Sequence, residues 1–369
     1  MTLPVSRDYP QSLADQLDRV LAQMPEPSGG PAVGQLEHAL AEAFHVPHAI
    51  AVSSGTEALH AALSACGIGQ GDEVLVPALS VVMTVAPLAA LGATPVFVDS
   101  EPATLDIDYD DAARKITPRT RAILPVHLWG RMGDPAALTA FASEHDLVII
   151  EDAAQAVGSS RDERAAGTIG AIGCFSMKDG KIVWSGEGGF LLTDRRDLAE
   201  HAVAFRSHWQ PAPSGQASLS RLATNSRLAA PLAAIALANV HRLEELVLLR
   251  RAQTRHLLHT LRPVPGLTVL APAADEHWNA FSPLLRVDLP GARTFTEHLA
   301  KQGVPNSTGS FRLVPCDTRP MFPRQDRPCR GAAQILDRTL AILLTERDTV
   351  ATLDRYAAVI TREATTWAG

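Results

Sequence analysis

From residue 48 onward the sequence alternates short, β-rich apolar runs with longer runs of helical character. Strands of a parallel sheet are buried on both faces and read as continuous apolar runs, and two such strands are usually joined by a crossover helix. The expected strands are residues 48–54, 72–79, 94–100, 121–128, 147–155, 171–177 and 188–194, and the expected helices are residues 56–67, 81–92, 108–116, 134–146 and 196–205. The alternation predicts the α/β class, with a mostly parallel, seven-stranded sheet that carries helices on both faces.

The segment Val74–Val98 contains no charged residue, and as one helix it would be long enough to span a bilayer. Pro77, Pro87 and Pro95 interrupt it, its two ends are β-rich, and its middle is helical. We therefore expect a buried strand, a helix and a second buried strand here, and no membrane partner.

Residues 229–258 read as one nearly unbroken helix, with Pro231 in the first turn, where proline is tolerated. Beyond it we expect a strand at 281–289, a helix and its connection at 294–304, and helices at 332–344 and 348–364. The proline-containing stretch 305–331 lacks periodicity and is expected to be a loop.

These elements predict two domains after an N-terminal segment. The segment covers residues 1–28, the large α/β domain residues 29–235, and a smaller C-terminal α+β domain residues 236–369, entered by the long helix. The chain length of 369 residues agrees with two domains of roughly 150 residues each.

Composition argues against several classes of function. The 33 basic residues face 40 acidic ones, a net charge of −7, and phosphate backbones are held by clustered Lys and Arg, so nucleic acid is not an expected partner. GxSxG, HExxH and GxxxxGK[ST] motifs and metal-ligand spacings are absent, so neither a hydrolase nor a metal site is expected. The four cysteines lack CxxC spacing and the first residues lack the order of a signal peptide, so we expect reduced thiols and a cytoplasmic protein.

A turn of small residues, Ser53-Ser54-Gly55-Thr56, joins the first expected strand to its helix. Free backbone N–H groups and the positive end of the helix dipole suit a phosphate at such a turn. The alternative is an ordinary helix N-cap.

Glu151 and Asp152 end the apolar run of the strand at 147–155, and Gln155 follows them. A carboxylate at the end of a buried strand needs a positive partner, and a protonated pyridine nitrogen is one such group. Alternatively, the carboxylate caps the next helix.

A loop after the strand at 171–177 carries Lys178 and Lys181 and leads into the glycine-rich sequence GEGG at 186–189. A lysine that small neighbours leave accessible can act as a Schiff-base nucleophile if its environment lowers its pKa. The alternative is a solvated loop cation. A fourth segment, residues 223–227, precedes the long helix and could equally be an N-cap.

As an ordered set, these segments resemble the fold-type-I pyridoxal-phosphate (PLP) enzymes, and among them the DegT-type aminotransferases of keto-sugars and keto-cyclitols. The resemblance extends over residues 27–258 and more loosely to the C-terminus; it includes GDEVLVPAL, GATPVFVD, LPVHLWG, EDAAQ, CFSM…K…GEGG and the N-x-R of residues 225–227. It implies the PLP transferase fold, PLP as cofactor, and amino transfer from glutamate or glutamine to a keto-sugar or keto-cyclitol in antibiotic or other secondary metabolism.

The resemblance also implies a role for each matching residue. Lys181, five residues before Gly186, forms the Schiff base with PLP, whereas Lys178 is out of that register. Asp152 is the second catalytic residue, because it pairs with the pyridine nitrogen and keeps it protonated. The other cofactor-binding residues are Gly55, Thr56 and Ser176 at the phosphate, Gln155 at the phenolic oxygen, Val81 at the ring, and Asn225 at the phosphate of the neighbouring subunit, which requires at least a homodimer.

The sequence departs from the family pattern at several positions. Val81 stands where an aromatic residue usually stacks on the cofactor ring, and Lys178 adds a second charge near Lys181. Trp209 replaces an expected glycine, and the His/Tyr-Pro pattern of the small domain is not evident around Ser310–Cys316.

The last two changes fall where the amino acceptor would be recognised. They leave open whether the acceptor is a nucleotide-linked keto-sugar, a free keto-sugar or a keto-cyclitol, and Arg312, Arg319 and Arg324 are the candidates for binding a substrate phosphate. Two alternatives to amino transfer also stay open, namely elimination or other non-transfer chemistry in the same fold and a non-catalytic, sensor-like protein.

Overall fold

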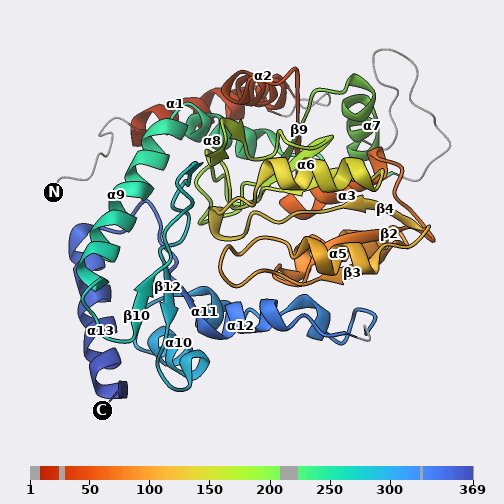
Figure 1. The fold of residues 1–369 in the computed structure, drawn as a ribbon. Coiled ribbons are helices and arrows are strands. Elements are labelled where there is room, and N and C mark those ends of the chain that lie inside the picture. The colour runs from red at the N-terminus through yellow and green to blue at the C-terminus, as the bar shows by residue number, and fades with distance from the viewer. Residues whose placement is uncertain (1–8, 25–29, 208–222, 325–326, 369) are drawn as a thin grey trace.

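The computed structural model describes residues 9–24, 30–207, 223–324 and 327–368, and a seven-stranded sheet lies at the centre of the large domain (Figure 1). Its strands are β1 (His48–Val52), β2 (Glu73–Pro77), β3 (Thr94–Val98), β4 (Thr120–Ile123), β5 (Val148–Asp152), β8 (Ile172–Ser176) and β9 (Gly189–Thr193). They lie in the order β1-β9-β8-β5-β4-β2-β3, and only β9 runs antiparallel to its neighbours. The predicted mostly parallel sheet is therefore confirmed.

Helices cover both faces of this sheet (Figure 1). One face packs against α3 (Gly55–Ala65), α4 (Val82–Ala90) and α7 (Arg196–Arg206), and the other against α2 (Ala32–Phe44), α5 (Tyr109–Lys115), α6 (Pro135–Glu144) and α8 (Ala230–Val240). Within β2, Val74 and Val76 belong to the first core and Leu75 to the second, because successive side chains of a strand point to opposite faces. A further helix, α1 (Tyr9–Ala22), lies beside α8.

The uncharged segment Val74–Val98 forms β2, α4 and β3, as predicted. Within the described ranges, no helix is both long enough and apolar enough to cross a membrane. All four cysteines are free thiols.

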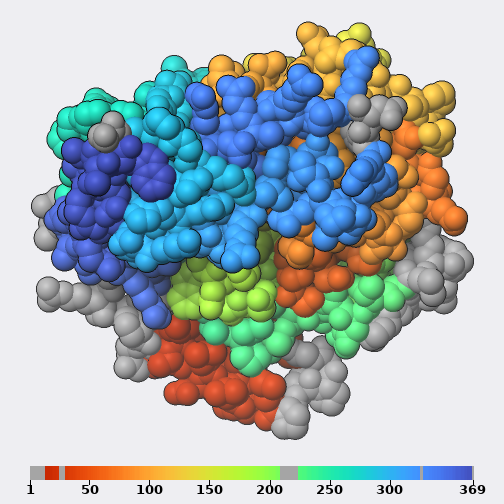
Figure 2. All heavy atoms as spheres, turned by 90° about the horizontal axis from the view of Figure 1, so that it is seen from below, coloured from red at the N-terminus to blue at the C-terminus, as the bar shows by residue number. Residues whose placement is uncertain are grey.

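The small domain is built on a three-stranded antiparallel sheet. Its elements are β10 (Leu267–Val269), β12 (Leu284–Val287), β13 (Thr339–Ala341), α9 (Leu243–Leu261), α10 (Ala292–Lys301), α11 (Ser307–Phe311), α12 (Arg330–Arg338) and α13 (Val350–Ala368). Leu257, Leu285, Phe295 and Ile360 are buried together in its core. A second three-stranded sheet consists of β6 (Ser160–Arg161), β7 (Arg164–Ala165) and β11 (Glu276–His277). It joins the segment after β5 to the segment after β10. Figure 2 shows the C-terminal residues (blue) lying against those of the large domain (orange).

The prediction of one helix over residues 229–258 is wrong, because α8 ends at Val240 and α9 begins at Leu243. The side-chain amide of Asn239 donates to the carbonyl of Trp184 (2.7 Å), which ties the end of α8 to the loop after β8. The break changes the direction of the chain, so that α8 packs in the large core and α9 reaches the small one. The predicted domain limit at 235/236 falls inside α8, and the limits of the three parts stay predictions.

Two predictions in the small domain also need correction. The helix expected over 332–344 stops at Arg338, because Thr339–Ala341 pair with β12 as a strand, and this pairing outweighs the helical periodicity. The expected loop 305–331 contains α11, whose N-cap is Asn306: its side-chain oxygen accepts the N–H of Gly309 at 2.7 Å.

Candidate active site

The carboxyl-terminal edge of the large sheet brings the predicted segments together. β1 ends before Ser54, β5 ends at Asp152 and β8 ends at Ser176, while antiparallel β9 begins at the same edge with Gly189. Ligands of open parallel sheets bind at this edge. Sheet topology alone therefore places four chemically distinct segments around one site.

The Ser54-Gly55-Thr56 turn begins α3 and packs tightly against β8 and β9. The Ser54 hydroxyl accepts the N–H of Glu57 at 3.1 Å, so the N-cap interpretation holds for this residue. A Cβ atom added to Gly55 would lie 2.7 Å from Cβ of Ser176, and one added to Gly189 would lie 2.4 Å from the carbonyl oxygen of Ser54. Only glycines allow this approach, so the N-terminus of α3 lies directly against the ends of β8 and β9.

Asp152 is buried and its carboxylate is held in place from two sides. Oδ2 accepts the Thr84 hydroxyl at 2.6 Å, and Oδ1 accepts the N–H of Ala154 at 3.0 Å. Charge-assisted hydrogen bonds of this kind fix the orientation of a carboxylate. Thr84 was not identified from the sequence; it lies on α4, and nothing local to residue 84 signals a contact with β5.

The neighbouring carboxylate, Glu151, points to the other face of β5 and is fully buried. It is saturated with donors, namely Nε2 of His127 and the N–H groups of Gly167, Ile169 and Gly170. Glu151 therefore fastens the loop before β8 to β5, and of the two acidic residues only Asp152 faces the site.

Lys181 is half-buried, and its Nζ lies 5.2 Å from the ring centroid of Phe281. Loss of solvent lowers the pKa of Lys181 to about 8; the Asp152 carboxylate opposes this shift, and the ammonium of Lys178 adds to it. Lys178 itself is exposed, with its Nζ 6.0 Å from the ring centroid of Phe311. The charge of Lys178 thus lowers the pKa of Lys181, but burial is the larger cause.

These groups line one cavity of about 790 Å³ between the two domains. Of the predicted site residues, it brings together Gly55, Thr56, Val81, Asp152, Gln155, Ser176 and Lys181, and also Lys178. The N–H of Trp129 donates to Oε1 of Gln155 at 2.7 Å, which leaves the amide NH₂ of Gln155 as the group available to a ligand.

Asn225 is the predicted site residue that the structure does not bring to this cavity. It is exposed, and it forms an isolated antiparallel bridge with Ser207. The carbonyl oxygen of the adjacent residue, Ser226, accepts the N–H of Ser53 at 2.7 Å. The segment is therefore attached to the chain directly before the Ser54-Gly55-Thr56 turn. Trp209 lies outside the described residues.

The small domain contributes the far wall of the cavity, whose residues were not identified from the sequence. It includes Ser307 and Phe311 of α11, Leu343–Thr345 and Asp348 of the segment before α13, and Tyr356 of α13. Arg312, Arg319 and Arg324 are not among the described residues that line it. Ser307 accepts Nε1–H of Trp129 at 3.0 Å and so connects the two walls. An N-cap at Asn306 was the one local signal that this segment turns into a helix.

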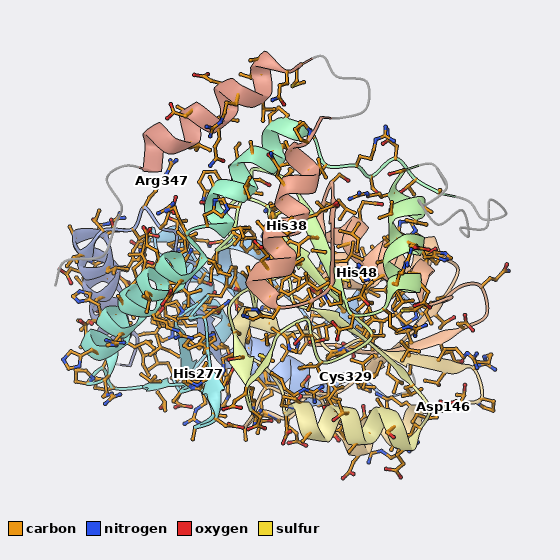
Figure 3. All side chains as sticks on the ribbon, turned by 90° about the horizontal axis from the view of Figure 1, so that it is seen from above. His38, His48, Asp146, His277, Cys329 and Arg347 are labelled. Atoms are coloured by element: carbon orange, nitrogen blue, oxygen red, sulfur yellow. The ribbon has the colours of Figure 1, made fainter. Side chains whose placement is uncertain are left out.

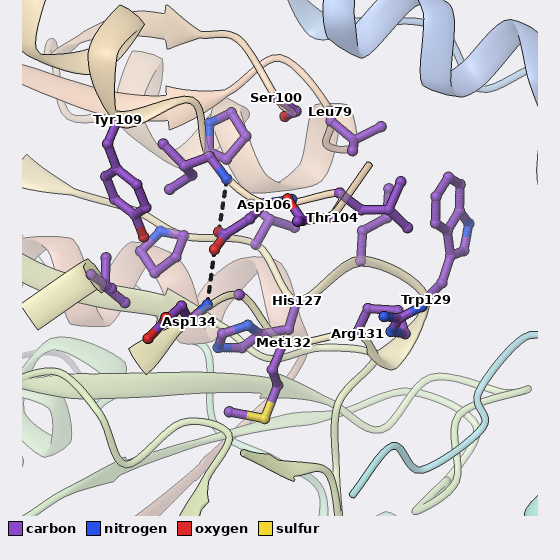
Figure 4. A pocket seen from close by; sticks show the side chains of 18 of the residues that line it. Leu79, Ser100, Thr104, Asp106, Tyr109, His127, Trp129, Arg131, Met132 and Asp134 are labelled. Atoms are coloured by element: carbon purple, nitrogen blue, oxygen red, sulfur yellow. Dashed lines mark hydrogen bonds between the residues drawn. The ribbon is translucent and has the colours of Figure 1, made fainter. Parts of the chain in front are cut away.

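A second cavity, of about 30 Å³, lies beside His127 and Trp129 (Figure 4). Asp106 lies in its wall, and its carboxylate accepts the N–H groups of Ile107 (2.7 Å) and Asp134 (2.8 Å), shown dashed in Figure 4. Burial raises the pKa of Asp106. A space of this size holds water and no substrate, so these contacts stabilise the fold.

The large cavity offers what PLP needs. Gly55, Thr56 and Ser176 form a cradle at a helix N-terminus for a phosphate, Asp152 presents an oriented carboxylate to a pyridine nitrogen, and Lys181 presents an amine to an aldehyde. The described residues contain no cluster of His, Cys, Asp and Glu suited to a metal ion. Figure 3 shows His38 on α2, His48 at the start of β1 and His277 on β11, so these histidines come from separate elements.

Comparison with known proteins agrees with this geometry. GDP-perosamine synthase from Caulobacter vibrioides is 40% identical over 59% of this chain and 58% of its own length. L-glutamine:2-deoxy-scyllo-inosose aminotransferase from Micromonospora echinospora is 45% identical over 46% of this chain and 40% of its own length. The chain thus matches about half the length of these two curated relatives. A pleiotropic regulatory protein from Geobacillus stearothermophilus is 33% identical over 87% of this chain and 86% of its own length.

The fold is also that of solved aminotransferases. The crystal structure of the aminotransferase TlmJ from Streptoalloteichus hindustanus superposes with a TM-score of 0.86 at 28% identity, covering 96% of both chains. Residues 11–360 match the DegT/DnrJ/EryC1/StrS aminotransferase family. The chain therefore belongs to the DegT/DnrJ/EryC1/StrS aminotransferase family, whose members depend on PLP.

Proposed function

We propose that this protein is a PLP-dependent aminotransferase that moves an amino group from glutamine or glutamate to a keto-sugar or keto-cyclitol in antibiotic or other secondary metabolism. The observation that carries the proposal is that Lys181, with its lowered pKa, and the oriented carboxylate of Asp152 line the same cavity as the Gly55–Ser176 cradle. The names of two relatives support the substrates, since one names perosamine and the other names L-glutamine and 2-deoxy-scyllo-inosose.

PLP, when bound, supplies an electron sink next to the reacting carbon of the substrate. Lys181 would supply the amine that holds the cofactor and, once freed, would take the proton from that carbon and deliver it to C4′ of the cofactor. Because the pKa of Lys181 is about 8, a useful fraction of the amine is neutral near pH 7 and the ammonium is still a competent acid. Its position beside the reacting carbon spares the cost of bringing in a separate base.

Three neighbours orient the cofactor. Asp152, held by Thr84 and the N–H of Ala154, keeps a proton on the pyridine nitrogen. Gln155 would offer its NH₂ group to the phenolic oxygen, because its amide oxygen already accepts the N–H of Trp129. Val81 gives the ring an aliphatic contact, which is weaker than aromatic stacking.

We propose a homodimer in the cytoplasm as the working form. Asn225 is exposed and lies away from the cavity of its own chain, which agrees with a role at the cofactor phosphate of a second copy. Free cysteines agree with a reducing compartment.

The central test replaces Lys181 and follows visible absorbance. Adding PLP to the wild-type protein should give a band that shifts when glutamine or glutamate is supplied, and Lys181→Ala should abolish both the band and turnover. Lys178→Ala is the matched control and should keep both, since Lys178 is exposed at the edge of the cavity. Turnover that survives in Lys181→Ala would refute the assignment.

A regulatory role is the second candidate, favoured by the name of the Geobacillus relative, a pleiotropic regulatory protein. A sensor-like protein of this kind would bind PLP without turning over an acceptor, and a non-transferring enzyme of the same fold would keep its absorbance band when the donor is added. The Lys181–Asp152 arrangement supports catalysis, and the donor-dependent band shift distinguishes all three.

A further inference from the structure

The acceptor end of the cavity is the wall that the small domain contributes, namely Ser307, Phe311, Leu344, Thr345, Asp348 and Tyr356. It joins apolar surface from Phe311 and Leu344 to hydroxyl groups from Ser307, Thr345 and Tyr356. A wall of this composition suits a compact ring that carries several hydroxyl groups.

Charge on the described lining of the cavity is predominantly negative. Lys181 and Asp152 are assigned to the cofactor, and beyond them the lining carries the carboxylates of Asp179, Glu187 and Asp348 against the single ammonium of Lys178. A nucleotide-linked sugar brings a diphosphate with two negative charges. Asp348 is half-buried, so its carboxylate would repel such a diphosphate with less screening by solvent than the exposed Asp179 and Glu187, and mismatched charges of this kind are how sites reject wrong ligands.

Asp348 is held rigidly at this end. Its Oδ2 accepts the N–H of Thr345 at 2.6 Å and the Thr345 hydroxyl at 3.1 Å, and its carbonyl oxygen accepts the Gln253 side chain at 2.9 Å. Tyr356 is buried, and its pKa is raised by that burial and by the neighbouring Asp348 carboxylate. The Asp348 carboxylate is therefore oriented by Thr345, while its Oδ1 is not among the acceptors of these bonds.

We propose that the acceptor is an uncharged, unphosphorylated ring ketone with several hydroxyl groups, and that Asp348 is a specificity-determining residue. Its carboxylate accepts hydrogen bonds from ring hydroxyls and repels a phosphate group. A hydrogen bond to a charged group discriminates between ligands more strongly than apolar contact does. This inference rests on the proposed aminotransferase function, whose acceptor class it narrows.

The first experiment compares acceptors with the PLP-loaded protein and glutamine as donor. The free ketone 2-deoxy-scyllo-inosose should have a kcat/KM at least tenfold above that of a GDP-linked 4-keto-sugar, and GDP alone should inhibit weakly. Calorimetry of the free ketone with the PLP-loaded protein, without donor, gives its affinity independently of turnover. A preference for the GDP-linked sugar would overturn the inference and leave the aminotransferase function standing, whereas loss of the donor-dependent band shift would overturn that function.

The second experiment uses Asp348→Asn, which keeps one acceptor oxygen for Thr345 and removes the charge. The affinity and kcat/KM for the free ketone should fall roughly 10- to 100-fold, while inhibition by GDP should strengthen several-fold. A purely structural role would weaken both ligands together, so movement in opposite directions is the distinguishing result.

Asp354→Asn is the matched control: Asp354 lies on α13, six residues after Asp348 and outside the cavity, and contacts His256. It should leave both affinities unchanged. If Asp348→Asn lowers the affinity for GDP as well, or changes neither ligand, the role of Asp348 is disproved.

Discussion

The two ends of the cavity are built in different ways. At the cofactor end, Gly55, Asp152 and Ser176 lie at the ends of β1, β5 and β8, whose positions are fixed by a continuous sheet. At the acceptor end, the wall consists of the short helix α11, the loop 343–348 and the side of α13. The first end is held by backbone pairing of neighbouring strands, and the second by side-chain contacts such as Trp129–Ser307.

This difference separates what the fold imposes from what it leaves variable. Moving Asp152 relative to Ser176 would require a change of register between β5 and β8, which would turn every side chain of a strand to the other face. Moving Asp348 requires only a change in a loop. We therefore expect substitutions at the cofactor end to affect cofactor affinity, and substitutions at the acceptor end to affect selectivity.

Gly55→Ala should have the largest effect, and it tests the cofactor end. The new Cβ would lie 2.7 Å from Cβ of Ser176, so the N-terminus of α3 must shift away from β8. Overpacking of this kind costs about 1–3 kcal/mol, which corresponds to a roughly 5- to 150-fold loss of PLP affinity if the cradle bears it. Titration with PLP, followed by absorbance, measures the loss.

Gly69→Ala is the matched control, because a Cβ there meets nothing within 4 Å. It should leave PLP affinity unchanged. Gly55→Ala should also leave the ratio of kcat/KM between free and nucleotide-linked acceptors unaltered. A change in that ratio would break the separation between the two ends.

The sequence predicts the site residues best where a single strand determines the position of the residue at its end. The apolar run of β5 followed by Asp152 indicates both the element and its functional end, and the same holds for Ser176 at the end of β8. The acceptor wall escapes such reasoning, because α11 and residues 343–356 lie apart in the sequence and come to line one cavity only in the folded small domain.

Two local errors have the same origin. The pattern over 332–344 is helical, yet Thr339–Ala341 form β13 because β12 offers a pairing edge far away in sequence. The helical composition of 229–258 likewise carries no signal of the hydrogen bond between Asn239, next to the break at the end of α8, and Trp184. In both places the sequence pattern misses a contact between residues far apart in the chain.

Val81→Tyr tests the contact between residue 81 and the cofactor ring. Val81 is the half-buried N-cap residue of α4 and has extended backbone angles, which a tyrosine also adopts. An aromatic ring stacked on the cofactor is worth about 0.5–1.5 kcal/mol, so PLP affinity should rise roughly 2- to 10-fold. Val81→Leu adds bulk without a ring and should give no such gain. Equal gains from both variants would show that size, and not stacking, is what the position lacks.

Lys178→Gln should have the smallest effect, and it tests whether the charge of Lys178 changes the pKa of Lys181. The neutral amine of Lys181 is the form that captures PLP, so the rate of PLP uptake by the apoprotein should rise with pH and level off above the pKa of Lys181, about 8. The positive charge of Lys178 lowers that pKa, so its removal should move the midpoint to higher pH, by less than about one unit because Lys178 is exposed and screened. Lys301→Gln, an exposed lysine of α10, is the control and should not move it. Added salt should reduce the difference in midpoint between wild type and Lys178→Gln, because it weakens the repulsion between the two lysines but leaves the burial of Lys181 in place. A midpoint of Lys178→Gln that moves to lower pH would contradict the sign assigned to the Lys178 charge.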